Sequence, residues 1–422
     1  MKHLTTDKQF SPSMDAFDTS DQEAKQMGDS VDLELSNSGS HPKIEWEMLT
    51  IFGILVMAGL LIRLIFYRLS SAEWVEYIIA SLIGIGCFLL VLRVNFYRML
   101  KWTWHLQIGF MILTLTIPLR SMFIPMSGDF HGFEYAWLQS LWILYPVIYA
   151  LVIYRMRSSG FVGLIATGTL LILPLLLSIK SDAMTLYGVI TCMACFILVM
   201  TAIFLRCYRC NRFFAVALVG GVSALGGYVL LIYAPYRAAR VLAPLHPMQD
   251  PRGVGWLTLR IRELLANAVW LGHGAALSDT TQLFLEQHTT FASDFVLTTL
   301  IYQYGFIIFA VLMILFLSLF AFGVYKTKRI SNQLGKLLAI GILTTLIAQT
   351  LLYIVPCLGY PAISSSALPF ITGHSIYLVF DYLMIGLLLS IFRTDTLFTD
   401  TLPHRKRLRL RISWDVGLED KW

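Results

Sequence analysis

Charged side chains are scarce in this sequence. Only 14% of its 422 residues are Asp, Glu, Lys or Arg, against about 25% in a typical soluble domain. Apolar residues make up 57% of the chain, so too little polar surface remains to cover a single soluble globule. Apolar runs of roughly 18 residues or more recur along it, and each can cross a bilayer core as a helix. We therefore expect an all-α polytopic membrane protein.

The cysteines do not form the pattern of a disulfide framework. Of the six, four lie in or beside apolar segments, and Cys207 and Cys210 form a C-x-x-C in a short basic loop, "RCYRCNR". A structural zinc site needs four ligands, and neither a second cysteine pair nor a histidine cluster accompanies this one. We interpret them as two cysteines beside the membrane.

The first 42 residues lack the apolar stretch of a signal peptide. They carry eight acids against three lysines and end in "SNSGSHP", a composition that predicts a disordered cytoplasmic tail. We expect three parts: this acidic tail at 1–42, a membrane domain at 43–396, and a basic cytoplasmic tail at 397–422 that contains "HRKRLRLR".

The apolar pattern predicts ten membrane spans. Helices are the expected form, because every backbone polar group must be satisfied inside the lipid. The spans are expected near 48–67, 75–92, 103–119, 137–154, 161–179, 183–205, 213–233, 295–325, 335–355 and 369–392.

Lysine and arginine predict the orientation. With the N-terminus in the cytoplasm, the inner loops carry twelve of these residues and the short outer loops carry three, namely Arg68, Arg120 and Lys180. The excess of positive charge belongs on the cytoplasmic side, where the basic C-terminal tail would also face an anionic leaflet. Both termini are therefore expected inside.

One outer connection, residues 234–294, is far longer than the others. Long loops in a compact protein are usually functional or disordered, and this one contains tryptophans and many leucines. Apolar residues at helical spacing predict a helix in the interface plane; they are Ile261, Leu264, Leu265, Ala268 and Leu271.

The long loop opens with "YRAARVLAPLHPMQDPRGVGW". This resembles the large outer loop of the shape, elongation, division and sporulation (SEDS) family of bacterial cell-wall membrane proteins. That family reads approximately R-x-x-x-x-x-x-P-x-x-D-P-x-G-x-G-Y here, and Trp256 replaces its tyrosine. Four further stretches resemble other motifs of the family and occur in the family's order. They are "KSDAMT", "SDFVLTTLIYQYGF", "LPFITGHSIY" and "GLLLSIFR".

The resemblance covers nearly the whole membrane portion and departs from the family at some positions. Asp294 and Phe295 stand eleven and ten residues before Gly305, as in the family, but the "HT" pair at His288 lies four residues upstream of its usual place. Tyr302 and Gln303 replace a Glu-Glu pair, and the family's Tyr-Gly-Gly is missing.

The resemblance implies a peptidoglycan glycosyltransferase that polymerises lipid II, the lipid-linked disaccharide, at the outer face of the bacterial cytoplasmic membrane. The acceptor's 4-hydroxyl would attack the donor's anomeric carbon, and undecaprenyl diphosphate would leave. Such a reaction needs a base for the hydroxyl proton, and a carboxylate becomes a better base when desolvation raises its pKa.

Asp294 is the expected base, since its motif and its spacing match the family's acid. The alternative from the residues alone is a helix N-cap, a position that aspartate favours. Arg237 and Arg240, three residues apart, can share a helix face and hold the diphosphate with their guanidinium forks, or else touch lipid headgroups. Further binding candidates are Asp250, His288 and Asp182.

The expected partners are lipid II, undecaprenyl diphosphate, membrane lipids and a transpeptidase of the class B penicillin-binding type, with no nucleic acid. A divalent cation, Mg²⁺ or Mn²⁺, could bridge the diphosphate and carboxylates, but no dedicated cage is visible. Two other functions stay open. A transporter of the lipid-linked precursor would use Asp381, an acid within a predicted span. A scaffold without catalytic activity would explain the departures from the family motifs.

Overall fold

The computed structural model describes residues 45–66, 71–93, 96–123, 131–157, 159–178, 185–208, 210–233, 244–253, 255–279, 281–282, 295–360, 367–371 and 375–395. The ordered elements in these ranges are helices, and no strand occurs among them. The expected all-α class is therefore confirmed for the part of the chain that the structure describes.

Along the chain, the described helices lie before the long loop, within it and after it. The first group is α2 (Trp46–Phe66), α3 (Ser71–Arg93), α4 (Tyr97–Lys101), α5 (Thr103–Phe123), α6 (His131–Arg155), α7 (Gly160–Ser178), α8 (Thr185–Phe204) and α9 (Arg212–Tyr233). The loop holds the 3-10 helix η2 (Pro247–Gln249) and α11 (Trp256–Ala266). The last group is α14 (Val296–Tyr304), α15 (Phe306–Arg329), α16 (Gln333–Cys357) and α17 (Ser375–Asp395).

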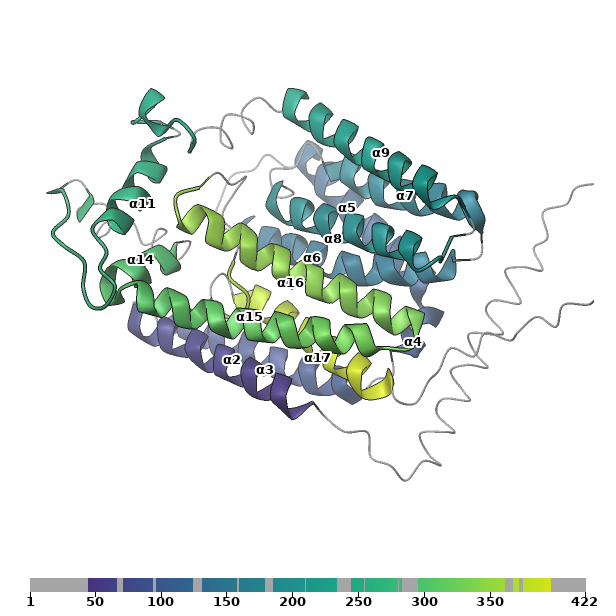
Figure 1. Ribbon diagram of the computed structural model, residues 1–422, viewed down its shortest axis with the longest axis horizontal. Coiled ribbons are helices and arrows are strands. Elements are labelled where there is room, and N and C mark those ends of the chain that lie inside the picture. Colours follow the sequence, from purple (N-terminus) through teal and green to yellow (C-terminus); the bar gives the residue numbers. More distant parts are fainter. Residues whose placement is uncertain are drawn as a thin grey trace, which may run out of the picture.

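The long helices form a bundle whose centre is α16 and α17. Figure 1 shows them running side by side, with α11 and α14 gathered at one end and α4 at the other. Of the apolar stretch of each helix, 83% is buried inside the protein in α17 and 61% in α16, but only 22% is buried in α3 and in α15. The outer helices thus expose much of their apolar surface, as expected where lipid replaces water as the solvent.

The most extensive helix pair is α3 with α17. Glycines let these helices approach closely: a Cβ on Gly84 would lie 2.7 Å from the Tyr382 ring, and one on Gly386 would lie 3.2 Å from the Cα of Phe88. Lipid tails are as apolar as leucine, so association in a membrane depends on close packing through small residues rather than on the hydrophobic effect.

Polar side chains inside the bundle bond to backbone carbonyls of neighbouring helices. The Thr191 hydroxyl of α8 donates to the Trp142 carbonyl of α6 at 2.7 Å. The Tyr145 hydroxyl donates to Leu170 of α7 at 2.8 Å. An unpaired polar group would be costly in this environment, so these bonds also fix which helices are neighbours.

The expected eighth span, 295–325, is wrong in one respect. The chain breaks at Gly305 into α14 and α15, because contacts with the long loop hold that glycine out of the helical region. The helix of the tenth expected span, α17, begins at Ser375 rather than at residue 369, after a turn that includes residues 367–371. The loop helix α11 ends at Ala266, so Ala268 and Leu271 lie beyond it. The short α4 was not expected.

Five of the described helices are long and apolar enough to cross a membrane, α2, α3, α15, α16 and α17. Shorter apolar stretches are described in α6, α7, α8 and α9. The chain is accordingly a multi-pass membrane protein, while the count of ten spans and the inside position of both termini stay predictions.

Candidate active site at the α11–α14 end of the bundle

Most of the predicted site residues fall outside the described part of the chain. These are Asp294, Arg237, Arg240, His288 and Asp182. Asp250 is described, and so is the residue that directly follows Asp294, Phe295. The site can therefore be built from the elements that lead into and out of these positions.

The short helix α14 begins two residues after Asp294 and is almost completely buried. Every residue from Phe295 to Tyr302 is buried. Its first turn is held by α16, since the Leu297 amide donates to the Tyr353 hydroxyl at 3.3 Å and the Thr298 hydroxyl donates to the Cys357 carbonyl at 2.7 Å. The backbone that enters α14 is thus held by contacts on a central helix.

The N-cap of α14 is Phe295, with φ −121° and ψ 36°, and its own side chain makes no capping bond. Asp294 stands one residue earlier. Asp294 lies outside the described residues, so a capping role for its side chain stays an alternative, one that is compatible with a role as the base.

The break between α14 and α15 is closed by a strap, residues 267–275. The amides of Gly272 and Gly274 donate to the last carbonyls of α14, those of Tyr304 and Tyr302, at 3.2 and 2.8 Å. Conversely, the first backbone amides of α15 donate to backbone carbonyls of the strap. Helix ends leave such groups without partners inside the helix, so the strap replaces what a continuous helix would have supplied.

Gly305 makes this geometry accessible. Its φ of 90° and ψ of 171° lie in a region that is essentially restricted to glycine. A Cβ there would lie 2.6 Å from the carbonyl oxygen of Trp270. The strap backbone therefore passes directly over the break.

A cluster around Glu263 anchors the chain after the strap. Its Oε1 accepts the Ser278 amide at 3.0 Å, and its Oε2 lies 2.8 Å from Arg260 Nη1 and accepts the Thr281 hydroxyl. Burial works against the charged carboxylate, but the bonds from Ser278, Thr281 and Arg260 outweigh it and lower the pKa of Glu263 to about 2. The cluster therefore holds the start of the segment that leads toward Asp294.

Arg262, which the sequence did not single out, ties three parts of this end together. From α11, its Nη2 donates to the Pro244 carbonyl at 2.6 Å and to the Gly359 carbonyl at 3.2 Å. No sequence pattern could have revealed these contacts, because the acceptors are backbone carbonyls and Gly359 lies 97 positions away.

Asp250 shapes the D-P-R-G-V-G turn. Its Oδ1 accepts the Gly253 amide at 2.9 Å, and its carbonyl accepts the Gly255 amide at 3.1 Å. This is the bonding by which aspartate favours turns. A direct role in binding substrate stays a prediction for this exposed residue.

Asp381 is buried at the centre of the bundle, with 1% of its surface exposed. Its Oδ2 accepts the Phe370 amide at 3.1 Å, and Phe370 has a φ of 67°, unusual for a residue other than glycine. The acid thus holds the turn before α17, a structural use that requires no transported substrate.

Among the residues that the structure describes, no group of three or more His, Cys, Asp or Glu could hold a metal ion. All six cysteines are free thiols.

A sequence profile of the family described as "cell cycle protein", which groups FtsW, RodA and SpoVE, matches residues 41–397. Among curated relatives, a probable peptidoglycan glycosyltransferase FtsW from Geobacter metallireducens is 30% identical over 39% of this chain and 43% of its own. The stage V sporulation protein E of Bacillus subtilis is 26% identical over 41% of this chain and 47% of its own. The chain thus matches less than half the length of these relatives.

Solved structures share the fold at low sequence identity. A chain of a peptidoglycan synthase complex, described for structural coordination of polymerization and crosslinking, superposes with a TM-score of 0.61 at 16% identity, covering 83% of this chain and 98% of that one. The rod shape determining protein RodA of Thermus thermophilus gives a TM-score of 0.55 at 13% identity, with 83% and 97% covered. The profile match across nearly the whole membrane portion shows that this chain belongs to the FtsW, RodA and SpoVE family of cell cycle proteins, as its motifs predicted.

Proposed function

We propose that this protein is a peptidoglycan glycosyltransferase that polymerises lipid II at the outer face of the bacterial cytoplasmic membrane. Membership of the family supports the proposal, as does the name of several relatives, probable peptidoglycan glycosyltransferase FtsW. The observation that carries it is the buried short helix α14, which begins two residues after Asp294 and ends at Gly305, where the strap closes the break.

The proposed reaction needs one proton transfer and one bond exchange. The acceptor's sugar 4-hydroxyl attacks the anomeric carbon of the donor, and its proton passes to the Asp294 carboxylate. The bond from that carbon to the diphosphate breaks, and undecaprenyl diphosphate leaves with the electron pair. Arg237 and Arg240 are proposed to hold the diphosphate, since guanidinium forks match phosphate oxygens.

The described geometry supports Asp294 as the base through its neighbours. Phe295 and the first turn of α14 are buried against α16, which fixes the backbone next to the acid. The Glu263 cluster fixes the other end of the segment that contains Asp294, at Ser278 and Thr281. A catalytic carboxylate needs such positioning, because small displacements are costly in rate.

Asp250, His288 and Asp182 are proposed as further contacts to the substrate at this face. A divalent cation that bridges the diphosphate and carboxylates is a prediction still, and the steps above use only residues of this chain. We also propose a class B penicillin-binding transpeptidase as the partner, which the fold match to a chain of a peptidoglycan synthase complex supports.

The test is polymerisation of lipid II by the purified protein together with its transpeptidase. Asp294→Asn keeps the size of the side chain and removes the base, so the rate should fall by at least about 100-fold, the usual contribution of general base catalysis. The matched control is Asp279→Asn, which removes an exposed acid from the same loop and should leave the rate unchanged.

Three outcomes would contradict the proposal. Full polymerisation by a folded Asp294→Asn variant would refute the role of this acid. No polymerisation by the unaltered protein, together with unchanged cell growth when Asp294→Ala replaces it, would favour a scaffold. Precursor flipping in vesicles that depends on Asp381 and not on Asp294 would favour a transporter.

A further inference from the structure

An open pocket of about 540 Å³ lies at the loop between α8 and α9, and none of the functions above uses it. Its lining is Arg206, Tyr208, Cys210, Asn211 and Arg212. Figure 1 shows this loop at the end of the bundle opposite α11 and α14, where α15 also ends. The basic last turn of α15, with Lys326, Lys328 and Arg329, makes this the end for which the distribution of charge predicts a cytoplasmic position.

The pocket is built on a fixed backbone. Arg206 has a φ of 58°, a left-handed conformation that glycine usually supplies at the end of a helix. The amides of Arg206 and Cys207 close the end of α8 by donating to Ile203 and Ala202. Beneath them Tyr208 is buried and its hydroxyl lies 3.1 Å from the Thr167 hydroxyl. These contacts before and after Arg206 in the chain hold its backbone in the left-handed conformation.

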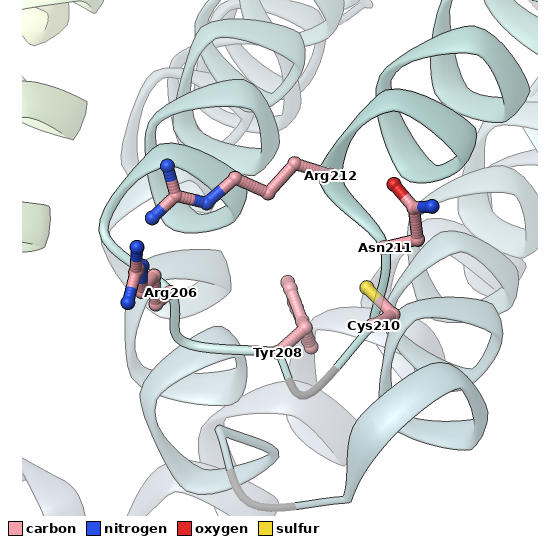
Figure 2. Close-up of a pocket in the computed structure, with 5 residues that line it drawn as sticks. All are labelled: Arg206, Tyr208, Cys210, Asn211 and Arg212. Carbon is pink, nitrogen blue, oxygen red and sulfur yellow. The ribbon is translucent and has the colours of Figure 1, made fainter.

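The two guanidinium groups share the pocket. Figure 2 shows the guanidinium groups of Arg206 and Arg212 on one side of it, with Cys210 and Asn211 on the other. Within the described ranges neither arginine has a carboxylate partner. Since both arginines line the pocket, an anion that enters it meets two positive charges, and hydrogen bonds from charged donors to an anion are the strong ones.

Exposed phenylalanines lie close in sequence to the two arginines of this pocket. Phe204, Phe213 and Phe214 are 64%, 87% and 56% exposed, and Phe161 packs on Phe214 with ring centroids 5.7 Å apart. They belong to the ends of the apolar helices α7, α8 and α9, for which we expect lipid chains rather than water as neighbours. A ligand that fits both features has an anionic head and apolar tails.

We propose that this pocket binds the phosphodiester headgroup of an anionic phospholipid in the cytoplasmic leaflet. The Arg206 and Arg212 guanidinium groups hold the phosphate oxygens, a geometry that arginine matches in bidentate fashion, and the acyl chains lie along the phenylalanines. Basic pockets between membrane helices on the cytoplasmic side are suited to such headgroups. The site is separate from the proposed glycosyltransfer site and does not depend on it.

The test measures lipid binding to the full-length protein by native mass spectrometry, with phosphatidylglycerol and phosphatidylcholine as probes. The variant Arg206→Gln/Arg212→Gln should lose about thirtyfold in affinity for phosphatidylglycerol, from the usual contribution of each basic side chain at an anionic surface. Binding of phosphatidylcholine should stay unchanged. The matched control, Lys328→Gln/Arg329→Gln, removes two positive charges from the same end of the protein and should bind as the unaltered protein does.

A second arm separates a lipid headgroup from a free phosphate. Inorganic phosphate, added at millimolar concentration, should not displace phosphatidylglycerol. If phosphate binds in an arginine-dependent manner and the lipid does not, the pocket is a site for a soluble anion and the lipid proposal is refuted. Equal loss of binding in the control variant would refute it too, since general surface charge would then suffice. The single variant Arg206→Gln, with an expected loss of about fivefold, serves if the double variant does not fold.

Discussion

Replacing Gly305 by alanine should destabilise the junction of α14, α15 and the strap. The new Cβ would lie 2.6 Å from the Trp270 oxygen, 2.7 Å from its carbonyl carbon and 2.8 Å from the Leu271 nitrogen. These are all backbone atoms, which cannot turn away as a flexible side chain can. In addition, a residue other than glycine at this φ and ψ costs about 1–3 kcal/mol.

The strap must move to accommodate the methyl group, and this weakens its bonds. Phe306 and Ile307 donate to the carbonyls of Val269 and Trp270 at 3.0 and 3.2 Å. Each such bond contributes about 0.5–1.5 kcal/mol net. With the backbone strain, we expect Gly305→Ala to lower the free energy of unfolding by about 2–5 kcal/mol.

The measurement is thermal unfolding of the purified protein in detergent, paired with Gly53→Ala as the control. Nothing lies within 4 Å of a Cβ at Gly53 in α2, so alanine there should be neutral or slightly stabilising. Under the proposed function, Gly305→Ala should also reduce polymerisation, because α14 carries the backbone next to Asp294. If Gly305→Ala were as stable as Gly53→Ala, the assignment of a locked helix break would be refuted.

Two further predictions concern buried or clustered acids. The pKa of Glu263 is about 2 in the folded protein and 4.5 ordinarily, so its charged form stabilises the fold above pH 4.5 and this contribution is lost as the pH falls toward 2. Between pH 4.5 and pH 2, the free energy of unfolding of the unaltered protein should fall by about 1–2 kcal/mol more than that of Glu263→Gln, after allowance for solvent screening. Unfolding measured at several pH values would show this difference, and a fall of the same size in both proteins would contradict the prediction. Asp381→Ala should lower stability by about 1–3 kcal/mol because the Phe370 amide loses its acceptor, whereas Asp381→Asn retains an acceptor and should be milder; equal stability of both variants would contradict the role in the turn.

The site itself was only partly accessible to sequence reasoning. Spacing to Gly305 selected Asp294, but it did not show that the residue after it, Phe295, is buried and is the N-cap of α14. The role of Asp250 in its own turn follows from a bond to Gly253, which the motif alone does not specify. Arg262 carries no motif, and its importance rests on backbone carbonyls brought close by folding.

What the sequence determined by itself is the class of the protein and most of its helices. Long apolar runs have no other form in lipid than a helix, so expected limits such as 183–205 and 335–355 lie within two residues of α8 (Thr185–Phe204) and α16 (Gln333–Cys357). The family followed from motif order as well. Only the tertiary structure decided where a run is interrupted. A glycine is tolerated inside an apolar helix, and Gly305 becomes a break because the strap, distant in sequence, supplies the hydrogen bonds that a continuous helix would have made.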